Sequence, residues 1–292
     1  MSTNWSTVAV MICAAATGTS VAQTSTDLWY GHGTTSVVMR SPQLLVAGID
    51  SKETYLYFTE SGVRREDREV CKAARLGSDF AMVAGLDRGG NGADGNGADG
   101  NNGARGKNDA RGKYYDALGL AASVWQPGDD LNALASKTEG AVAPPLIALL
   151  SQIRVADPTD FNRRFRGQTV AEIGLFGVEN RVPRLVILEF TEVESAAGPV
   201  SLSLRETRCP GACSAASTAY FLGSHDEIEG AVRRNPKLLS PPSDRNVETL
   251  IRLEMLHRPD IVGGPVALVA MNQAGVEFVN PGICSSLELS AR

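Results

Sequence analysis

The side chains with the clearest chemical potential lie near the start of the chain. There His32-Gly33-Thr34-Thr35 leads into an apolar stretch and then into Ala47-Gly48-Ile49-Asp50-Ser51-Lys52. A threonine hydroxyl is a weak nucleophile until a base removes its proton. The α-amino group of a chain that begins at a threonine can act as that base, because its pKa of about 7.7–8.0 is close to neutral. Glycine at position 33, directly before Thr34, gives the backbone more conformational freedom there than other residues would.

This stretch resembles the start of a mature proteasome β-type subunit, from a family of N-terminal nucleophile (Ntn) hydrolases. In that family a Gly-Thr bond is cut autocatalytically, and the new N-terminal threonine becomes the nucleophile. A strand pair then leads to an aspartate in an Asp-Ser-Arg/Lys signature, and the spacing from Thr34 to Asp50 agrees with the family without a gap. Weaker similarities follow at 71–76, 80–85, 221–224 and 262–265.

The resemblance implies a catalytic group made of Thr34, Asp50, Lys72, Gly85 and Ser224. Lys72 would lie beside the Thr34 hydroxyl and lower its pKa, while Asp50 would hold that ammonium in place and keep it charged. The Gly85 N–H would stabilise the oxyanion, a contribution worth about 3–4 kcal/mol in other hydrolases. Ser224 would join the hydrogen-bond network around the amine. The resemblance implies no cofactor and no metal ion.

One segment departs from the family pattern, which has Asp-x-x-Ser-Gly-Gly before the last strands. Counting back from Gly263-Gly264, Val262 stands at the Ser position and Pro259 at the Asp position. Half of the amine network is therefore missing or rearranged. One alternative is a non-catalytic secreted proteasome-like domain that serves binding or assembly. Another is a secreted binding domain of an unrelated β-rich fold. In that case we expect Asp50 and Lys72 to lie away from Thr34.

Groups of strands and helices are expected to position these residues. Short apolar runs predict strands at 35–39, 43–49, 55–58, 72–76, 80–84, 169–176, 185–193, 219–222, 266–271 and 276–279. Helices are expected at 114–125, 130–154 and 247–257, the second with a break or restart at Pro144-Pro145. Since strands and helices are grouped rather than alternating, an α+β fold is expected. The resemblance specifies a four-layer αββα sandwich of the proteasome-like Ntn type.

The chain is expected to carry one such domain, residues 34–292, behind a removable leader. An apolar run from Thr7 to Ala16, followed by small residues as far as Ala22, indicates a signal peptide over 1–22 and leaves a propeptide at 23–33. Residues 87–112 have few apolar side chains, which predicts a flexible glycine-rich insertion. The alternative for this segment is a calcium-binding repeat, but two degenerate copies are too few to stack.

Composition excludes several classes of function. The 292 residues carry a formal net charge of -5, so the basic excess that binds a nucleic-acid backbone is missing. No apolar run reaches the roughly 18–20 residues of a membrane span. The sequence has no Walker A, G-x-S-x-G or H-E-x-x-H motif, and its three histidines form no metal-ligand pattern.

Four cysteines follow the leader, namely Cys71, Cys209, Cys213 and Cys284, and their even number is compatible with disulfides in an oxidising compartment. We therefore expect a secreted or periplasmic protein, with the cytoplasm as the alternative. The expected activity is that of a threonine-type peptidase or amidase whose partner is a peptide or small amide. A homo-oligomer is a further option.

Overall fold

The computed structural model describes residues 28–91, 114–194, 198–213 and 218–284. Their strands form two antiparallel sheets. The nine-stranded sheet has the order β11-β10-β9-β7-β1-β4-β5, with β6 and β8 also paired to β7. Its strands are β1 (Leu28–His32), β4 (Lys52–Thr59), β5 (Gly62–Glu69), β6 (Ala73–Leu76), β7 (Asp79–Asn91), β8 (Tyr114–Asp116), β9 (Thr169–Glu179), β10 (Val182–Glu192) and β11 (Leu202–Cys209).

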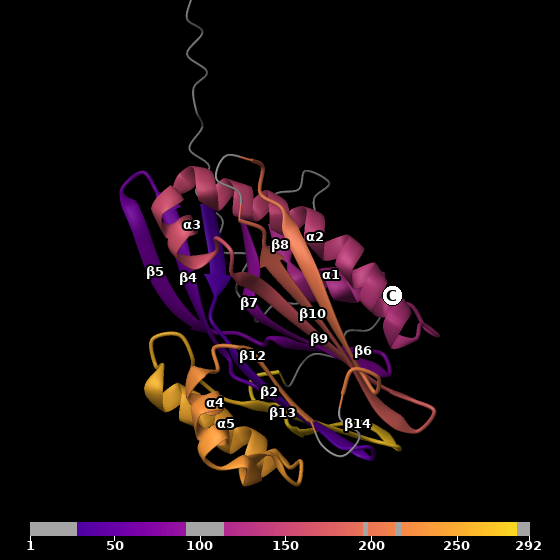
Figure 1. Ribbon diagram of the computed structural model, residues 1–292. Coiled ribbons are helices and arrows are strands. Elements are labelled where there is room, and N and C mark those ends of the chain that lie inside the picture. Colours follow the sequence, from indigo (N-terminus) through magenta and orange to yellow (C-terminus); the bar gives the residue numbers. More distant parts are fainter. Residues whose placement is uncertain (1–27, 92–113, 195–197, 214–217, 285–292) are drawn as a thin grey trace, which may run out of the picture.

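The five-stranded sheet has the order β12-β2-β3-β13-β14. Its strands are β2 (Thr35–Arg40), β3 (Leu44–Ile49), β12 (Thr218–Gly223), β13 (Ala267–Asn272) and β14 (Gly275–Asn280). The helices are α1 (Ala117–Val124), α2 (Leu131–Ala156), α3 (Pro158–Arg164), α4 (Asp226–Arg234) and α5 (Asp244–His257), with a 3₁₀ turn at Pro236–Leu239. Helices α1–α3 lie over the nine-stranded sheet, and α4 and α5 lie beyond the five-stranded sheet (Figure 1).

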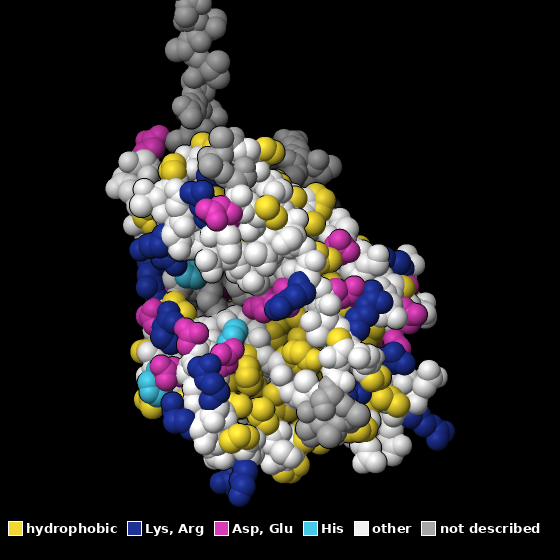
Figure 2. Space-filling model, viewed as in Figure 1, with side chains coloured by type: hydrophobic (Ala, Val, Ile, Leu, Met, Phe, Trp, Pro, Cys, Tyr) yellow, Lys and Arg dark blue, Asp and Glu magenta, His cyan; other side chains and the backbone are white. Residues whose placement is uncertain are grey.

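Three apolar clusters hold these parts together. The largest joins α1–α3 to the nine-stranded sheet and contains Leu146, Ile173 and Leu188. A second lies between the two sheets, around Phe80 and Val269. The third joins α4 and α5 to the five-stranded sheet. Charged side chains of both signs are interspersed on the face shown in Figure 2, and hydrophobic side chains gather on its lower half.

The structure contradicts the predicted fold class, an α+β four-layer αββα Ntn sandwich. Strands make up 44% of the described residues and helices 30%, in two sheets with few helices, so the chain is more β-rich than such a sandwich. The sequence prediction undercounted strands because it placed none at β1, β5 or β11 and because the helix expected at 114–125 begins only at Ala117, after β8. Strand β5 is mostly exposed and half of β11 is exposed, and both carry charged residues in place of the apolar residues that predict a strand.

Two local predictions are also wrong. Helix α2 continues through Pro144 and Pro145 without the expected break, because Val142 and Leu146 on either side are buried in the same core. The insertion predicted for 87–112 is incorrect over residues 87–91, which belong to β7. The rest of the predicted insertion, residues 92–112, lies outside the described residues, as does the predicted signal peptide at 1–22.

Local residues account for two hairpin turns and one helix cap. The β9–β10 hairpin turns at Asn180 and Arg181, which both have positive φ as a tight two-residue hairpin requires. The closing hairpin, β13–β14, turns between Asn272 and Gly275. Ser243 caps α5, since its side chain accepts a hydrogen bond from the N–H of Asn246.

Disulfides join Cys71 to Cys284 and Cys209 to Cys213. The first closes a separation of 213 residues and fixes the position directly before Lys72. Bonds of this kind persist in oxidising compartments. Across the described ranges, every helix is too short or too polar to cross a membrane.

Candidate active site

The predicted site residues gather where the chain crosses between the two sheets. Gly33 and Thr34 link β1 to β2, and Asp50 with Ser51 links β3 back to β4. Lys72 directly precedes β6, with its side chain fully enclosed. Thr34, Asp50 and Lys72 are each at most 2% exposed. The two crossings therefore bring together residues from distant parts of the chain in a dry environment.

The Gly33 carbonyl lies at the centre of this cluster. Its oxygen accepts a hydrogen bond of 2.5 Å from Lys72 Nζ and another of 2.5 Å from Thr34 Oγ1. Because a carbonyl bond is about 1.2 Å long, Oγ1 lies within about 3.7 Å of the Gly33 carbonyl carbon. This separation is close to that of reacting atoms before bond formation. The hydroxyl and the ammonium thus both donate to the same carbonyl oxygen.

Glycine is required at position 33 by both conformation and space. Its φ is 102°, a region that side chains with a Cβ rarely adopt. A Cβ there would lie 2.8 Å from the carbonyl oxygen of Ile261. The turn leading into Thr34 therefore depends on this residue.

Asp50 and Lys72 form a buried ion pair, with 3.4 Å between Oδ1 and Nζ. Lys72 Nζ also donates to the carbonyl oxygens of Gly33 and Lys52, so the three donors of an ammonium have three acceptors. Asp50 accepts the N–H of Thr35 at Oδ1 and that of Gly263 at Oδ2, both at 2.9 Å. Burial raises the pKa of Asp50, and the Lys72 charge and these N–H groups oppose the rise. The alternative of an unrelated β-rich fold, in which Asp50 and Lys72 would lie away from Thr34, is therefore wrong on this point.

Ser224 reaches Thr34 through its backbone. Its N–H donates to the Thr34 carbonyl oxygen at 2.8 Å, whereas its hydroxyl donates to Glu254 Oε1 at 2.8 Å. Glu254 is fully buried, and its other oxygen accepts the N–H groups of Glu227 and Ile228 at the start of α4. Glu254 therefore ties α5 and α4 to Ser224. Its position on the apolar face of α5 was a signal that sequence analysis missed.

Gly85 lies in β7, next to Leu86, which pairs with His32. Its φ is 84°, and a Cβ there would lie 2.6 Å from the carbonyl oxygen of Val170. The contacts described for the Gly33 oxygen come from Lys72 and Thr34. Close packing against β9 accounts for glycine at position 85, and its role toward an oxyanion stays a prediction.

A second buried carboxyl, Glu172 of β9, was also missed. Its Oε2 accepts the N–H of Gly223 at 2.6 Å, and a Cβ on Gly223 would lie 2.2 Å from the Thr34 carbonyl oxygen. Glu172 therefore supports the turn that packs on Thr34. Burial raises the pKa of Glu172 to about 7, while the Gly223 N–H opposes the rise.

At the two positions that depart from the family pattern, the structure has a buried apolar side chain and a backbone hydrogen-bond acceptor. Val262 is buried, and the Pro259 carbonyl oxygen accepts a hydrogen bond of 2.6 Å from Lys52 Nζ. Gly263 instead binds the loop around Asp50, since its carbonyl oxygen accepts the N–H of Lys52. This segment thus stabilises the Asp50 loop through its backbone.

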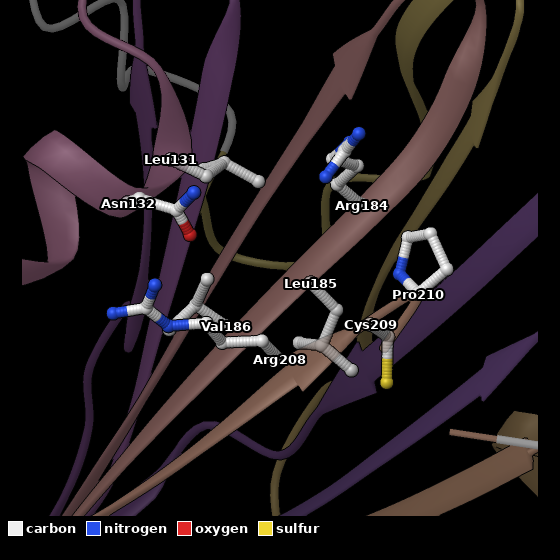
Figure 3. A pocket seen from close by; sticks show the side chains of 8 residues that line it. All are labelled: Leu131, Asn132, Arg184, Leu185, Val186, Arg208, Cys209 and Pro210. Atoms are coloured by element: carbon white, nitrogen blue, oxygen red, sulfur yellow. The ribbon is translucent and has the colours of Figure 1, made fainter. Parts of the chain in front are cut away.

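A separate cavity of about 100 Å³ lies where α2 begins (Figure 3). Its lining includes Arg184 and Arg208, which pair with Glu179 and Glu206 respectively. The predicted catalytic residues do not line it. Within the described ranges there is also no group of three or more His, Cys, Asp or Glu arranged to hold a metal ion.

In comparisons with known proteins, no family model matches the chain and no curated protein matches its sequence.

Proposed function

We propose that the chain is a threonine-type amide hydrolase that cleaves its own Gly33–Thr34 bond and then uses Thr34 as an N-terminal nucleophile. The observation that carries the proposal is the convergence of Thr34 Oγ1 and Lys72 Nζ on the Gly33 carbonyl oxygen. Lys72 polarises the carbonyl and stabilises the negative charge that develops on it, and Asp50 holds the ammonium.

Self-cleavage proceeds in two steps, formation of an ester and its hydrolysis. Thr34 Oγ1 attacks the Gly33 carbonyl carbon, the C–N bond breaks, and the hydroxyl proton ends on the nitrogen, which becomes the α-amine of Thr34. Water then attacks the resulting ester, the C–Oγ1 bond breaks, Thr34 regains its hydroxyl and Gly33 leaves as a carboxylate. The freed amine is the base for later attacks by Thr34 on a peptide or small amide.

A non-catalytic role in binding or assembly is the second candidate. The burial of Thr34 favours this role: its side chain is only 2% exposed, and β1, directly before it, is paired on both sides in the sheet. A separate substrate therefore has no open path to the hydroxyl. In this case the Gly33–Thr34 bond stays intact. The two candidates differ in the N-terminus of the mature protein.

Intact-mass measurement of the purified chain, followed over days at neutral pH, tests the proposal. We expect a new chain that begins at Thr34, its loss in Thr34→Val, which keeps the shape of the side chain, and its retention in Thr34→Ser. Hydroxylamine should accelerate cleavage and leave a hydroxamate on Gly33, because it attacks an ester far faster than an amide. Lys72→Met should slow cleavage about 10²–10³-fold. A wild-type chain that stays uncut would support the non-catalytic alternative.

The disulfides support a secreted or periplasmic location. Mass measurement with and without a reductant tests this, since both bonds should be present in protein isolated from its native compartment.

A further inference from the structure

Strand β1 lies in the sheet as a bound peptide would, and it ends at the proposed cleavage point. It pairs antiparallel with β4 on one side, from Leu28–Phe58 to His32–Thr54, and with β7 on the other. If the Gly33–Thr34 bond is cut, β1 is no longer joined covalently to the domain. The edges of β4 and β7 thus form a slot that holds an extended peptide directly before the scissile bond.

Helix α3 binds the side chain of Tyr30, the fourth residue before the scissile bond. Tyr30 is fully buried, and its hydroxyl donates to Asp160 Oδ2 at 2.7 Å. Asp160 Oδ1 accepts hydrogen bonds from Arg163 and Arg164, which fix the carboxylate in place. Burial opposes the charged form of Asp160, but the hydrogen bonds from Tyr30 and the two arginines outweigh it and lower its pKa. A phenylalanine in the slot would leave this carboxylate without its phenol donor.

The same helix contacts the side chain of His32, the second residue before the bond. Arg164 Nη1 lies 3.2 Å from His32 Nε2. A guanidinium can only donate, so Nε2 must accept, and the ring is neutral with its proton on Nδ1. Burial and then the positive charge of Arg164 lower the pKa of His32 to about 4, in agreement with a neutral ring.

Glycine is selected at the position between them by a buried side chain. A Cβ on Gly31 would lie 1.6 Å from Oε1 of Glu53 in β4. Glu53 is fully buried, and its Oε2 lies 3.4 Å from Arg88 Nε, so a Cβ at position 31 would force this carboxyl group to shift within the core. Together with the requirement at Gly33, the slot therefore excludes side chains at alternate positions of the bound strand.

We propose that the slot between β4 and β7 is specific for peptides of the form Tyr-Gly-His-Gly before the cleaved amide, with Asp160, Arg164 and Glu53 as the specificity-determining residues. This inference rests on the proposed function and names its substrate class. The chain's own residues 30–33 are the first substrate of this class.

The test measures two quantities in the full chain, the rate of cleavage at Gly33–Thr34 and the hydrogen-exchange protection of residues 28–32. Tyr30→Phe, His32→Leu, Asp160→Asn and Gly31→Ala each disturb one contact of the slot. We expect cleavage to slow at least about tenfold in each, because small displacements of reacting atoms have large effects on rate. Protection of β1 should fall in parallel. His32→Gln, which keeps a neutral acceptor, should recover part of the rate.

Matched controls are Glu139→Gln on the exposed side of α2 and Asn162→Ala on the exposed side of α3, both away from β4 and β7. Both should cleave and exchange like the wild type. If wild type cleaves but the slot variants match it in rate and protection, the specificity is refuted and the proposed function stands. If wild type does not cleave, the proposed function fails, and exchange decides: protection of β1 that depends on Asp160 and Tyr30 supports recognition, and unchanged protection refutes it.

Discussion

Removing the charge of Asp50 should destabilise the fold strongly, because it leaves the Lys72 ammonium buried without its anion. With 3.4 Å between Oδ1 and Nζ and an effective dielectric constant of about 20, the pair attraction is about 5 kcal/mol. We expect Asp50→Asn to lower the free energy of unfolding by about 3–5 kcal/mol. The new amide also turns an NH₂ group toward backbone donors that Asp50 accepts, which include the N–H groups of Thr35 and Gly263.

The reverse change, Lys72→Met, should lower the free energy of unfolding less, by about 1–3 kcal/mol, because Asp50 keeps its N–H donors and can take up a proton. The double variant should therefore lose less than the sum of the single losses, with a coupling of about 2–3 kcal/mol.

Urea unfolding followed by tryptophan fluorescence measures these values, and a Thr34→Val background keeps every chain covalently identical. Glu139→Gln, an exposed change on α2, is the control and should be neutral. Additivity of the two single changes within about 0.5 kcal/mol would refute the ion-pair argument.

Three further predictions concern other parts of the molecule. Burial raises the pKa of Glu172 to about 7, so the folded state holds more protons than the unfolded state between about pH 4.5 and 7, and this carboxyl lowers stability as pH rises through that window. Glu172→Gln should flatten the pH dependence of unfolding by up to about 3 kcal/mol, while Glu139→Gln should leave it unchanged. Cys71→Ala should lower stability by about 2–5 kcal/mol in urea unfolding, more than Cys213→Ala, because the bond it removes closes a far longer loop. Directly after cleavage, residues 28–33 should remain paired with β4 and β7, so native mass spectrometry should give one mass and denaturing spectrometry two; excess Tyr-Gly-His-Gly peptide should then displace the segment from the slot, and a segment that the peptide cannot displace contradicts this.

Much of the secondary structure could be predicted from local sequence. The strand pair around Ser41-Pro42, the turn at Asn180-Arg181 and the cap at Ser243 depend on neighbouring residues alone, and the structure agrees with each. The predictions failed where distant packing decides. Two prolines do not break α2 because its flanks are buried, and β1 is a strand because β4 and β7 supply its partners.

The sequence by itself determined which residue types could do chemistry and that Gly33 precedes Thr34 at a spacing of 16 residues from Asp50. Only the tertiary structure decided how they meet. Lys72, which directly precedes β6, reaches the Gly33 oxygen at the crossing from β1 to β2, and Glu172 and Glu254 enter the surroundings of Thr34 from other elements. The balance of strand over helix was likewise decided by pairing between distant segments. Hydrogen bonds between strands join residues far apart along the chain, so local patterns carry little information about them.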